Sequence, residues 1–139
     1  MKYFDEIEAR VYFEDTDAGG IVYHSKYLNF AERGRTEFLR KKNLEQRQLK
    51  EKYGFSFVVK SLNIDYLGSS FLDDLLIIKS YVSSLNKAKV NFLQLILKQK
   101  EIIARVDVTV CCVNKNRKIS RMNNHIYDIL KKCERKRNE

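Results

Sequence analysis

The sequence predicts an α+β fold in which one antiparallel sheet wraps around one central helix. Three observations support this prediction: a strand-like segment opens the chain, a long amphipathic helix follows it, and four strand-like segments then come one after another. Consecutive strands joined by short turns pair antiparallel, and one face of such a sheet needs a cover. The long helix is the obvious cover.

Hydrophobic periodicity and turn residues delimit the expected elements. Residues 7–13 alternate as a half-buried strand, with Ile7, Ala9, Val11 and Phe13 on the inward face. Residues 24–42 carry apolar side chains at helical spacing, and small residues on that face predict close packing against the helix backbone. The other expected elements are a short helix over residues 45–53 closed by Gly54, strands over residues 55–67, 75–85, 88–100 and 102–113, and a final helix around residues 126–130 with Asn123 or Asn124 as N-cap.

The chain has 139 residues, a length that fits one domain. It contains no internal repeat, low-complexity segment or linker, so we expect residues 1–139 to form a single domain. Residues 131 to 139 are expected to be a basic tail that ends the last helix and frays into solvent.

The net charge of +9 allows several interpretations. It suits nucleic acid, anionic lipid or a phosphorylated ligand, and it equally suits a lysine-rich solvated surface. Two points argue against nucleic-acid binding. The sequence contains no recognition motif for it, and the aromatic residues fall mostly on apolar faces. No apolar run approaches the ~18 residues of a membrane span. Asp5 and Glu6 stand where a signal peptide needs apolar residues, so we expect a cytoplasmic protein.

The three cysteines are Cys111, Cys112 and Cys133. Neighbouring residues on a strand point to opposite faces, which disfavours a bridge between the first two. No CxxC or Cys/His spacing suggests zinc. We expect three reduced thiols and no metal site.

The loop before the long helix carries the strongest chemical signal. It reads Glu14-Asp15-Thr16-Asp17-Ala18-Gly19-Gly20 and combines two carboxylates with a glycine pair. A helix N-terminus presents unpaired N–H groups that suit an anion or a developing oxyanion. A carboxylate beside such a site is what acyl transfer to water needs. The alternative is structural, because Asp15, Thr16 and Asp17 also suit a turn or a helix cap.

Two segments of the chain resemble a known signature. Residues 10–28 read RVYFEDTDAGGIVYHSKYL and residues 32–40 read ERGRTEFLR. This pattern resembles the YbgC branch of the 4-hydroxybenzoyl-CoA thioesterase family. The resemblance implies a hotdog fold, a five-stranded antiparallel sheet around a long helix, in subunits that pair into dimers and often into tetramers. It implies hydrolysis of short-chain or aromatic acyl-CoA thioesters to the free acid and coenzyme A, with no cofactor.

The resemblance also assigns roles to matching residues. Asp17 matches the catalytic carboxylate, acting as general base or as nucleophile. The backbone N–H of His24 matches the group that polarises the thioester carbonyl. The His24 side chain either orients water or the acid, or serves only as a structural hydrogen-bonding residue.

Glu32 is a rival carboxylate. It lies eight residues after His24, a little over two helical turns, so it can face the same side. Another branch of hotdog thioesterases uses a helix-borne glutamate, which gives Glu32 a catalytic or substrate-contacting role. The alternative is an ion pair with Arg33 or Arg35.

Coenzyme A carries phosphates, so basic contacts are expected. The resemblance places them at Lys87 and Lys89, and Lys115, Arg117 and Lys118 form a second basic turn. Relatives bind coenzyme A across the dimer interface, so these contacts can come from a neighbouring subunit. The alternative is a solvated lysine-rich surface. Phe57, Val59 and Tyr66 are candidates for the acyl pocket.

A different class of function stays open at this point. The chain could be a non-catalytic or weakly catalytic partner that binds acyl thioesters or acyl carrier protein for envelope or phospholipid machinery. In that class, binding would survive the loss of the Asp17 carboxylate.

Overall fold

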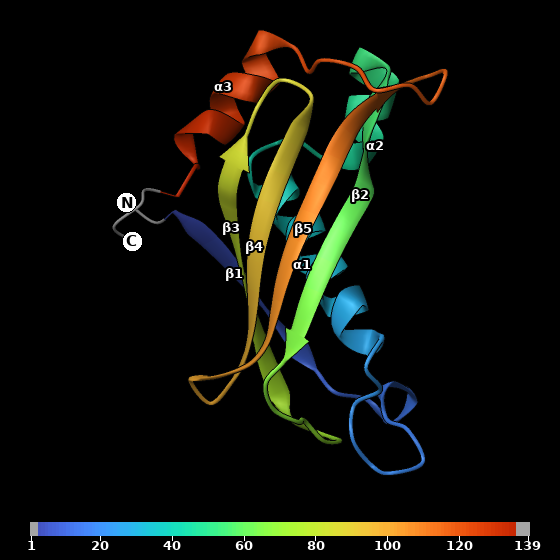
Figure 1. Cartoon of the computed structure of the whole chain (residues 1–139), viewed down its shortest axis with the longest axis vertical. Helices are drawn as coiled ribbons and strands as arrows, with labels where there is room; N and C mark the ends of the chain where they lie inside the picture. Colours follow the sequence, from blue (N-terminus) through green and yellow to red (C-terminus); the bar gives the residue numbers. More distant parts are fainter. Residues whose placement is uncertain (1–2, 136–139) are drawn as a thin grey trace.

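A computed structural model describes residues 3–135 and contains a five-stranded sheet with helices on it (Figure 1). Its elements in chain order are β1 (Phe4–Arg10), the 3-10 turn η1 (Phe13–Asp15), α1 (Lys26–Lys41), α2 (Gln46–Gln48), the π-helical turn η2 (Leu49–Tyr53), β2 (Phe55–Tyr66), β3 (Leu75–Leu85), β4 (Lys89–Lys98), β5 (Glu101–Asn114) and α3 (Asn124–Lys132).

Every strand pair in the sheet is antiparallel, and the strand order is β1-β3-β4-β5-β2. The edges are therefore β1 and β2, and α1 lies across one face (Figure 1). The loop between β1 and α1 lies at one end of the sheet, and α3 with the β3–β4 turn lies at the other. This arrangement confirms the predicted α+β fold.

The backbone of α1 approaches the sheet closely at Gly34. A Cβ atom there would lie 2.7 Å from Ile78 Cγ2 and 3.0 Å from Gln94 Nε2. Side chains of this helix that turn inward are Tyr27, Phe30, Ala31, Arg35, Phe38 and Leu39. Glycine is needed at the contact because any side chain would push the helix off the strands. The close packing predicted from small residues on this helix face is confirmed.

A buried polar group fixes α1 on the sheet. The Gln94 side chain on β4 is fully buried, and its Nε2 donates to Ala31 O at 2.7 Å and to Ser80 Oγ at 2.8 Å. Its Oε1 accepts from Arg35 Nη1 at 2.9 Å. The amide thereby joins α1, β3 and β4 in one network, which is the condition under which a buried polar side chain is tolerated.

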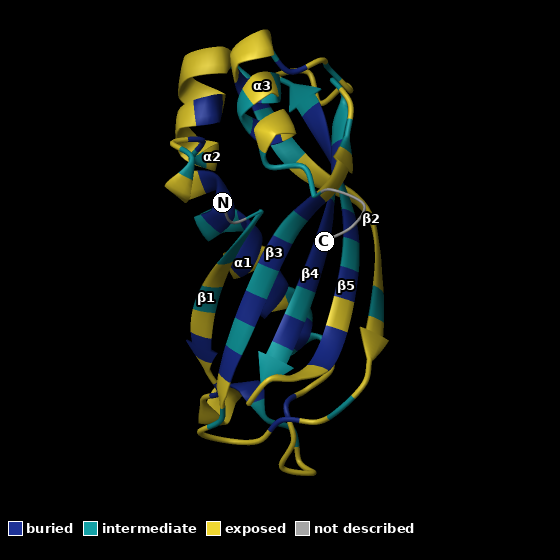
Figure 2. Cartoon of the chain, turned by 90° about the vertical axis from the view of Figure 1, so that its left-hand side faces the viewer, coloured by how far each residue is buried: buried dark blue, intermediate teal, exposed yellow. Residues whose placement is uncertain are grey.

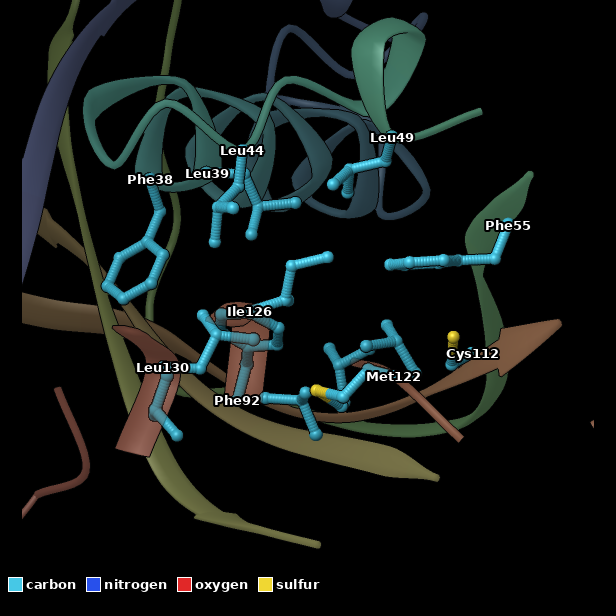
Figure 3. Packing of buried hydrophobic residues seen from close by; sticks show 14 of the residues in the cluster. Phe38, Leu39, Leu44, Leu49, Phe55, Phe92, Cys112, Met122, Ile126 and Leu130 are labelled. Atoms are coloured by element: carbon cyan, nitrogen blue, oxygen red, sulfur yellow. The ribbon is translucent and has the colours of Figure 1, made fainter. Parts of the chain in front are cut away.

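Two apolar clusters form the core. The larger one lies between α1, η2, α3 and the sheet, as Figure 3 shows for Phe38, Leu49, Phe92 and Leu130. The second lies under the N-terminal half of α1 and is built from Ala9, Val11, Val22, Tyr27, Phe30, Leu76, Ile78, Ile96, Ile103 and Ala104. Burial of apolar surface at about 25 cal/mol per Å² makes such clusters the dominant stabilising contribution.

Strand β2 is an edge strand, and most of its residues are exposed (Figure 2). Its exposed apolar residues are Val58, Val59, Leu62 and Tyr66, each between 42% and 47% accessible. A long, apolar, unpaired edge is a site for pairing with another strand.

Among the described residues, no helix is long and apolar enough to cross a membrane.

The predicted strand over residues 7–13 is wrong at its end. Strand β1 stops at Arg10, and Phe13, predicted to face inward, is 81% exposed. The cause is Asp15, whose Oδ2 accepts from Tyr12 N–H at 2.8 Å and whose own N–H donates to Tyr12 O. The chain therefore turns into η1 after Tyr12, and the alternation ends with it.

The C-terminal helix begins as predicted, because the Asn123 side chain caps it by accepting from Ile126 N–H at 2.9 Å. The basic tail ends the helix at Lys132, as predicted, but the expected fraying is wrong for residues 133–135. The helix continues to Lys132. Glu134 then forms an isolated parallel β-bridge with Val82, and Arg135 N–H donates to Val82 O at 2.7 Å. The rest of that predicted tail, residues 136–139, lies outside the described residues.

All three cysteines are free, as predicted.

Candidate active site

Asp17 sits in a tight turn between η1 and α1. Its N–H donates to Ile21 O at 2.9 Å, and Gly20 N–H donates back to Asp17 O at 3.0 Å. The carboxylate Oδ1 accepts from Gly19 N–H at 2.8 Å. No described residue donates a hydrogen bond to the other carboxylate oxygen. The turn anticipated as the structural alternative is present, and it leaves one oxygen of Asp17 available.

The structure brings Asp17 and His24 into one cavity of about 210 Å³. Three segments supply its walls: the loop before α1, the start of α1, and the end of β2 with the residues that follow. The lining residues are Asp17, Ile21, Val22, His24, Tyr27, Tyr66, Gly68 and Ser69. A partly apolar cavity with a carboxylate in it is the usual form of a small-molecule site.

The backbone N–H of His24 lies just before α1 and points away from the helix. The helix begins at Lys26, two residues later than predicted, and Lys26 N–H donates to Tyr23 O at 2.9 Å. Since the C=O and N–H of a trans peptide point in opposite directions, His24 N–H faces away from the helix. Within residues 3–135 it has no hydrogen-bond acceptor. It is thus available to a ligand.

Tyr66 closes the cavity from β2. Its hydroxyl donates to His24 O at 2.9 Å, and its ring meets the His24 ring edge to face at 6.4 Å. The buried pair Tyr27 Oη and Ser70 Oγ, 2.7 Å apart, holds the same segment to α1. The sequence suggested Tyr66 only as a pocket candidate, because nothing local indicates a bond to a residue 42 positions earlier.

The two acids of the loop have different environments. Asp15 is 7% exposed; its side chain holds the turn at Tyr12, its carbonyl accepts from Tyr23 N–H at 2.9 Å, and Lys26 Nζ lies 3.9 Å from Oδ1. Asp15 therefore shapes the loop. Asp17 is the acid that reaches the cavity.

Glu32 lies outside the Asp17 cavity. It lines a second, larger pocket of about 330 Å³ between α1, the start of β2 and the sheet. The other residues of that pocket are Arg35, Leu39, Gln46, Phe57, Val58, Val59, Val90, Phe92, Val110 and Leu130. The predicted common face with His24 does not bring the two side chains into one cavity of the chain. Of the three predicted acyl-pocket residues, Phe57 and Val59 are here and Tyr66 is with Asp17.

Arg35 is the buried cation of this second pocket. Burial lowers the pKa of its guanidinium, and the charge of Glu32 partly opposes that shift. In the part of the chain that the structure describes, the Glu32 carboxylate forms no ion pair within 4.0 Å with either Arg33 or Arg35. The ion pair expected as the alternative for Glu32 is therefore absent.

Lys87 and Lys89 lie far from Asp17 in the same chain. They stand at the β3–β4 turn, where Lys87 Nζ donates to Asn124 Oδ1 and lies 4.6 Å from the Tyr127 ring centre. The Asp17 loop lies at the other end of β3, roughly 33 Å away at ~3.3 Å per residue. Lys115 and Arg117 line a further cavity of about 620 Å³ at the lysine end, with Lys50, Gly54, Ser56, Val58, Val113 and Asn114. Lys118 is not among its lining residues.

Among the described residues, no group of three or more His, Cys, Asp or Glu side chains could hold a metal ion. The chemistry that the site supports with its own groups is attack on a carbonyl, assisted by a carboxylate and a main-chain N–H.

Comparison with known proteins places this arrangement in a family. The family model described as the thioesterase-like superfamily matches residues 11–130. The chain is 47% identical over 105 residues to the acyl-CoA thioesterase YbgC of Haemophilus influenzae, covering 76% of this chain and 77% of that protein. It is 39% identical over 106 residues to the acyl-CoA thioester hydrolase YbgC of Escherichia coli, covering 76% and 78%.

Solved structures agree with the fold. A probable thioesterase from Bartonella henselae superposes with a TM-score of 0.83 at 36% identity, over 86% of this chain and 99% of that chain. A mutant 4-hydroxybenzoyl CoA thioesterase complexed with 4-hydroxybenzoyl CoA superposes with a TM-score of 0.86 at 14% identity, over 93% and 99%, which shows the fold alone. The chain therefore belongs to the YbgC acyl-CoA thioesterases, a hotdog-fold branch of the 4-hydroxybenzoyl-CoA thioesterase family.

Proposed function

We propose that this acyl-CoA thioesterase hydrolyses its substrates with the Asp17 carboxylate while the His24 main-chain N–H polarises the thioester carbonyl. The observation that carries the proposal is their presence in one cavity, with one Asp17 oxygen and the His24 N–H both unpaired among residues 3–135. An N–H aimed at a developing oxyanion contributes ~10²–10³ in rate, and general-base assistance contributes ~10²–10⁴.

Two routes use the same groups. In the first, Asp17 takes a proton from water, the hydroxide adds to the thioester carbon, and the coenzyme A thiolate leaves and takes up the proton held by Asp17. In the second, Asp17 itself adds to the carbon, the thiolate leaves, and water hydrolyses the mixed anhydride. In both, negative charge develops on the carbonyl oxygen, where the His24 N–H is expected to donate.

The test follows free thiol release from a panel of acyl-CoAs from acetyl to decanoyl and from benzoyl-CoA. We expect turnover on short-chain or aromatic members, and a loss of at least ~10² in kcat for Asp17→Asn. Asp128→Asn, an exposed acid on α3, is the matched control and should keep wild-type kcat. Wild-type turnover by Asp17→Asn would show that another group does the chemistry.

We further propose that two copies pair through β2 into a dimer, which can associate into a tetramer. The exposed apolar edge of β2 supports this. A centred antiparallel pair places the Phe55 end of one β2 beside the Tyr66 end of the other. The pocket that contains Glu32 and Arg35, together with the basic groups of the same copy, would then lie next to the Asp17 cavity of its partner.

This pairing gives the lysines a place in substrate binding. Lys89 on β4 pairs with Cys111 on β5, and Cys111 pairs with Val58 on β2. Lys89 therefore lies at the same end of the sheet as Phe55, the first residue of β2. We propose that Lys87 and Lys89, together with Lys115 and Arg117, face the phosphates of coenzyme A bound at the partner's Asp17.

Lys→Ala changes should raise KM for acyl-CoA and leave KM for the matching acyl-pantetheine, which has no phosphate, unchanged. Equal effects on both substrates would contradict phosphate binding, and a monomer by sedimentation at micromolar concentration would contradict the dimer.

A further inference from the structure

The turn between β5 and α3, residues 114–121, presents a run of exposed cations (Figure 1). We refer to these residues as the basic turn. Its charged side chains are Lys115, Arg117, Lys118 and Arg121, and all four are exposed. The sequence holds no Asp or Glu from residue 108 to residue 127. Within residues 3–135 none of the four cations lies within 4.0 Å of a carboxylate. The basic turn is therefore a compact patch of positive charge without acidic partners.

Hydrogen bonds fix the shape of the basic turn. Asn114 Oδ1 accepts from Asn116 N–H at 2.9 Å and from Lys118 N–H at 3.2 Å. Asn114 N–H donates to Lys118 O at 2.9 Å, and Ser120 N–H donates to Cys112 O at 2.8 Å. Because the backbone is already held on the sheet, the cations lose little backbone entropy when a partner binds.

Ile119 is exposed in the middle of these charges. Its side chain is 62% accessible, and its backbone forms an isolated bridge with Val113. A single exposed isoleucine is ordinary on a protein surface, so its position between Lys118 and Arg121 is the informative point. The cations favour contact with negative charge, whereas the isoleucine favours removal from water. A partner that suits both offers negative charge directly beside an apolar layer.

A bilayer of anionic phospholipids has this composition. Its headgroups attract clusters of about 4–8 Lys and Arg side chains, and its acyl boundary lies within ~5–10 Å of the bound surface. Lys118 can keep its ammonium among the headgroups while its methylene groups follow Ile119 inward. A nucleic acid presents phosphates without an accessible apolar layer. An acidic protein has to match four cations and Ile119 with side chains in fixed places.

We propose that the basic turn docks this protein on the surface of an anionic phospholipid bilayer, with Ile119 inserted at the level of the acyl chains. This docking is a property beyond the proposed hydrolysis. Lys115 and Arg117 also line the cavity of about 620 Å³, whereas Lys118 and Arg121 are not among its lining residues. Lys118, Ile119 and Arg121 therefore separate membrane docking from the proposed binding of coenzyme A phosphates.

Co-sedimentation with vesicles tests the contribution of the charges. The probes are vesicles of phosphatidylcholine alone and of an equimolar mixture of phosphatidylcholine and phosphatidylglycerol. Wild type should bind the mixed vesicles and not the neutral ones, and added salt should weaken the binding. Lys118→Ala/Arg121→Ala should weaken it by about 25-fold, since each cation near the surface contributes about 5-fold. Lys100→Ala/Arg105→Ala removes equal charge from exposed sites near the start of β5, far from the basic turn, and should bind like wild type.

Fluorescence tests the insertion of Ile119. The chain has no tryptophan, so Ile119→Trp introduces a single indole at the exposed site. Its emission should shift to shorter wavelength on the mixed vesicles and should be quenched by brominated acyl chains. Ile102→Trp, at a position that is 40% exposed at the start of β5, is the matched control and should show neither change. Ile119→Ser keeps every cation and should weaken binding by about 10-fold.

Four results would overturn the proposal: no binding to the mixed vesicles, equal binding to the neutral ones, equal losses in the two double variants, or unshifted emission of bound Ile119→Trp. Binding to poly-glutamate that requires Lys118 and Arg121, without binding to vesicles, would assign the basic turn to an acidic protein partner instead. None of these results bears on the thiol release by which Asp17→Asn is judged, so the failure of membrane docking and the failure of the proposed function are distinguishable.

Discussion

The Tyr66 hydroxyl donates a 2.9 Å hydrogen bond to the main-chain carbonyl of His24. The bond joins the last residue of β2 to the turn that precedes α1, across 42 positions of sequence. It orients the peptide next to the proposed oxyanion donor, so the edge strand and the site are mechanically connected.

Removing this hydroxyl tests that connection. Tyr66→Phe should lower kcat several-fold and reduce the free energy of unfolding by about 1 kcal/mol, the usual net value of one hydrogen bond. Tyr53→Phe is the control, because Tyr53 is similarly exposed at 37% and its hydroxyl makes no hydrogen bond to the described residues. Steady-state kinetics and urea unfolding provide the two readouts. An unchanged kcat in Tyr66→Phe would mean that the His24 turn keeps its shape without β2.

The two glycines after Asp17 should respond differently to alanine. A Cβ at Gly19 would lie 3.2 Å from Asp17 Oδ1, whereas a Cβ at Gly20 meets nothing within 4 Å but the residue has φ of +85°. Gly19→Ala should therefore reduce kcat by displacing the carboxylate, with stability nearly unchanged. Gly20→Ala should cost about 1 kcal/mol of unfolding free energy through backbone strain. Measuring both quantities in both variants checks the contrast, and the reverse pattern would refute it.

Gln94 should be among the most sensitive core positions. Gln94→Met keeps the volume but leaves Ala31 O, Ser80 Oγ and Arg35 each short of a partner, so the free energy of unfolding should fall by about 2–4 kcal/mol. Gln48→Met, on the exposed surface of α2, should stay within about 0.5 kcal/mol of wild type. Chemical denaturation of the three proteins measures this. A loss below 1 kcal/mol at Gln94 would show that the helix can settle without the network.

The buried Cys112 thiol predicts a loss of stability in alkali. Burial, and secondarily the charge of Cys111, raises the pKa of Cys112 from 9.0 to about 11. Because the folded state disfavours the thiolate, this contribution is complete below pH 9 and is lost as the pH rises from 9 to 11. In Cys112→Ala the free energy of unfolding should fall less steeply across that window than in wild type. Identical slopes would show that Cys112 ionises equally in both states.

Periodicity predicts the sheet better than it predicts the loop. Strand β3 begins and ends at the predicted residues, because its alternation runs between clear turn signals at Asp73-Asp74 and Asn86-Lys87. The two failures come from local hydrogen bonds, one made by a side chain and the other within the backbone. Asp15 ends β1 three residues early, and the turn from Tyr23 delays α1 to Lys26. Such local bonds compete with regular structure and leave no periodic signal.

The candidate site was predictable only where its parts are close in sequence. Asp17 and His24 are seven residues apart, and a loop before a helix brings them together. Tyr66 reaches His24 over 42 positions and Gln94 reaches Arg35 over 59 positions, and the hydrophobic pattern does not encode such distant bonds. The same limit explains Glu32: helical spacing gives its face, but the division of that face into two pockets depends on where β2 crosses it.

The contact at Gly34 also constrains how the sequence can change over time. A Cβ there would lie 2.7 Å from Ile78, and 3.0 Å from both Gln94 Nε2 and Ser80 Oγ. Position 34 can therefore accept a larger residue only in a background where its neighbours on β3 and β4 have already become smaller. Across homologues, the residues at 34, 78, 80 and 94 are expected to be exchanged together, as a co-varying set that spans one helix and two strands.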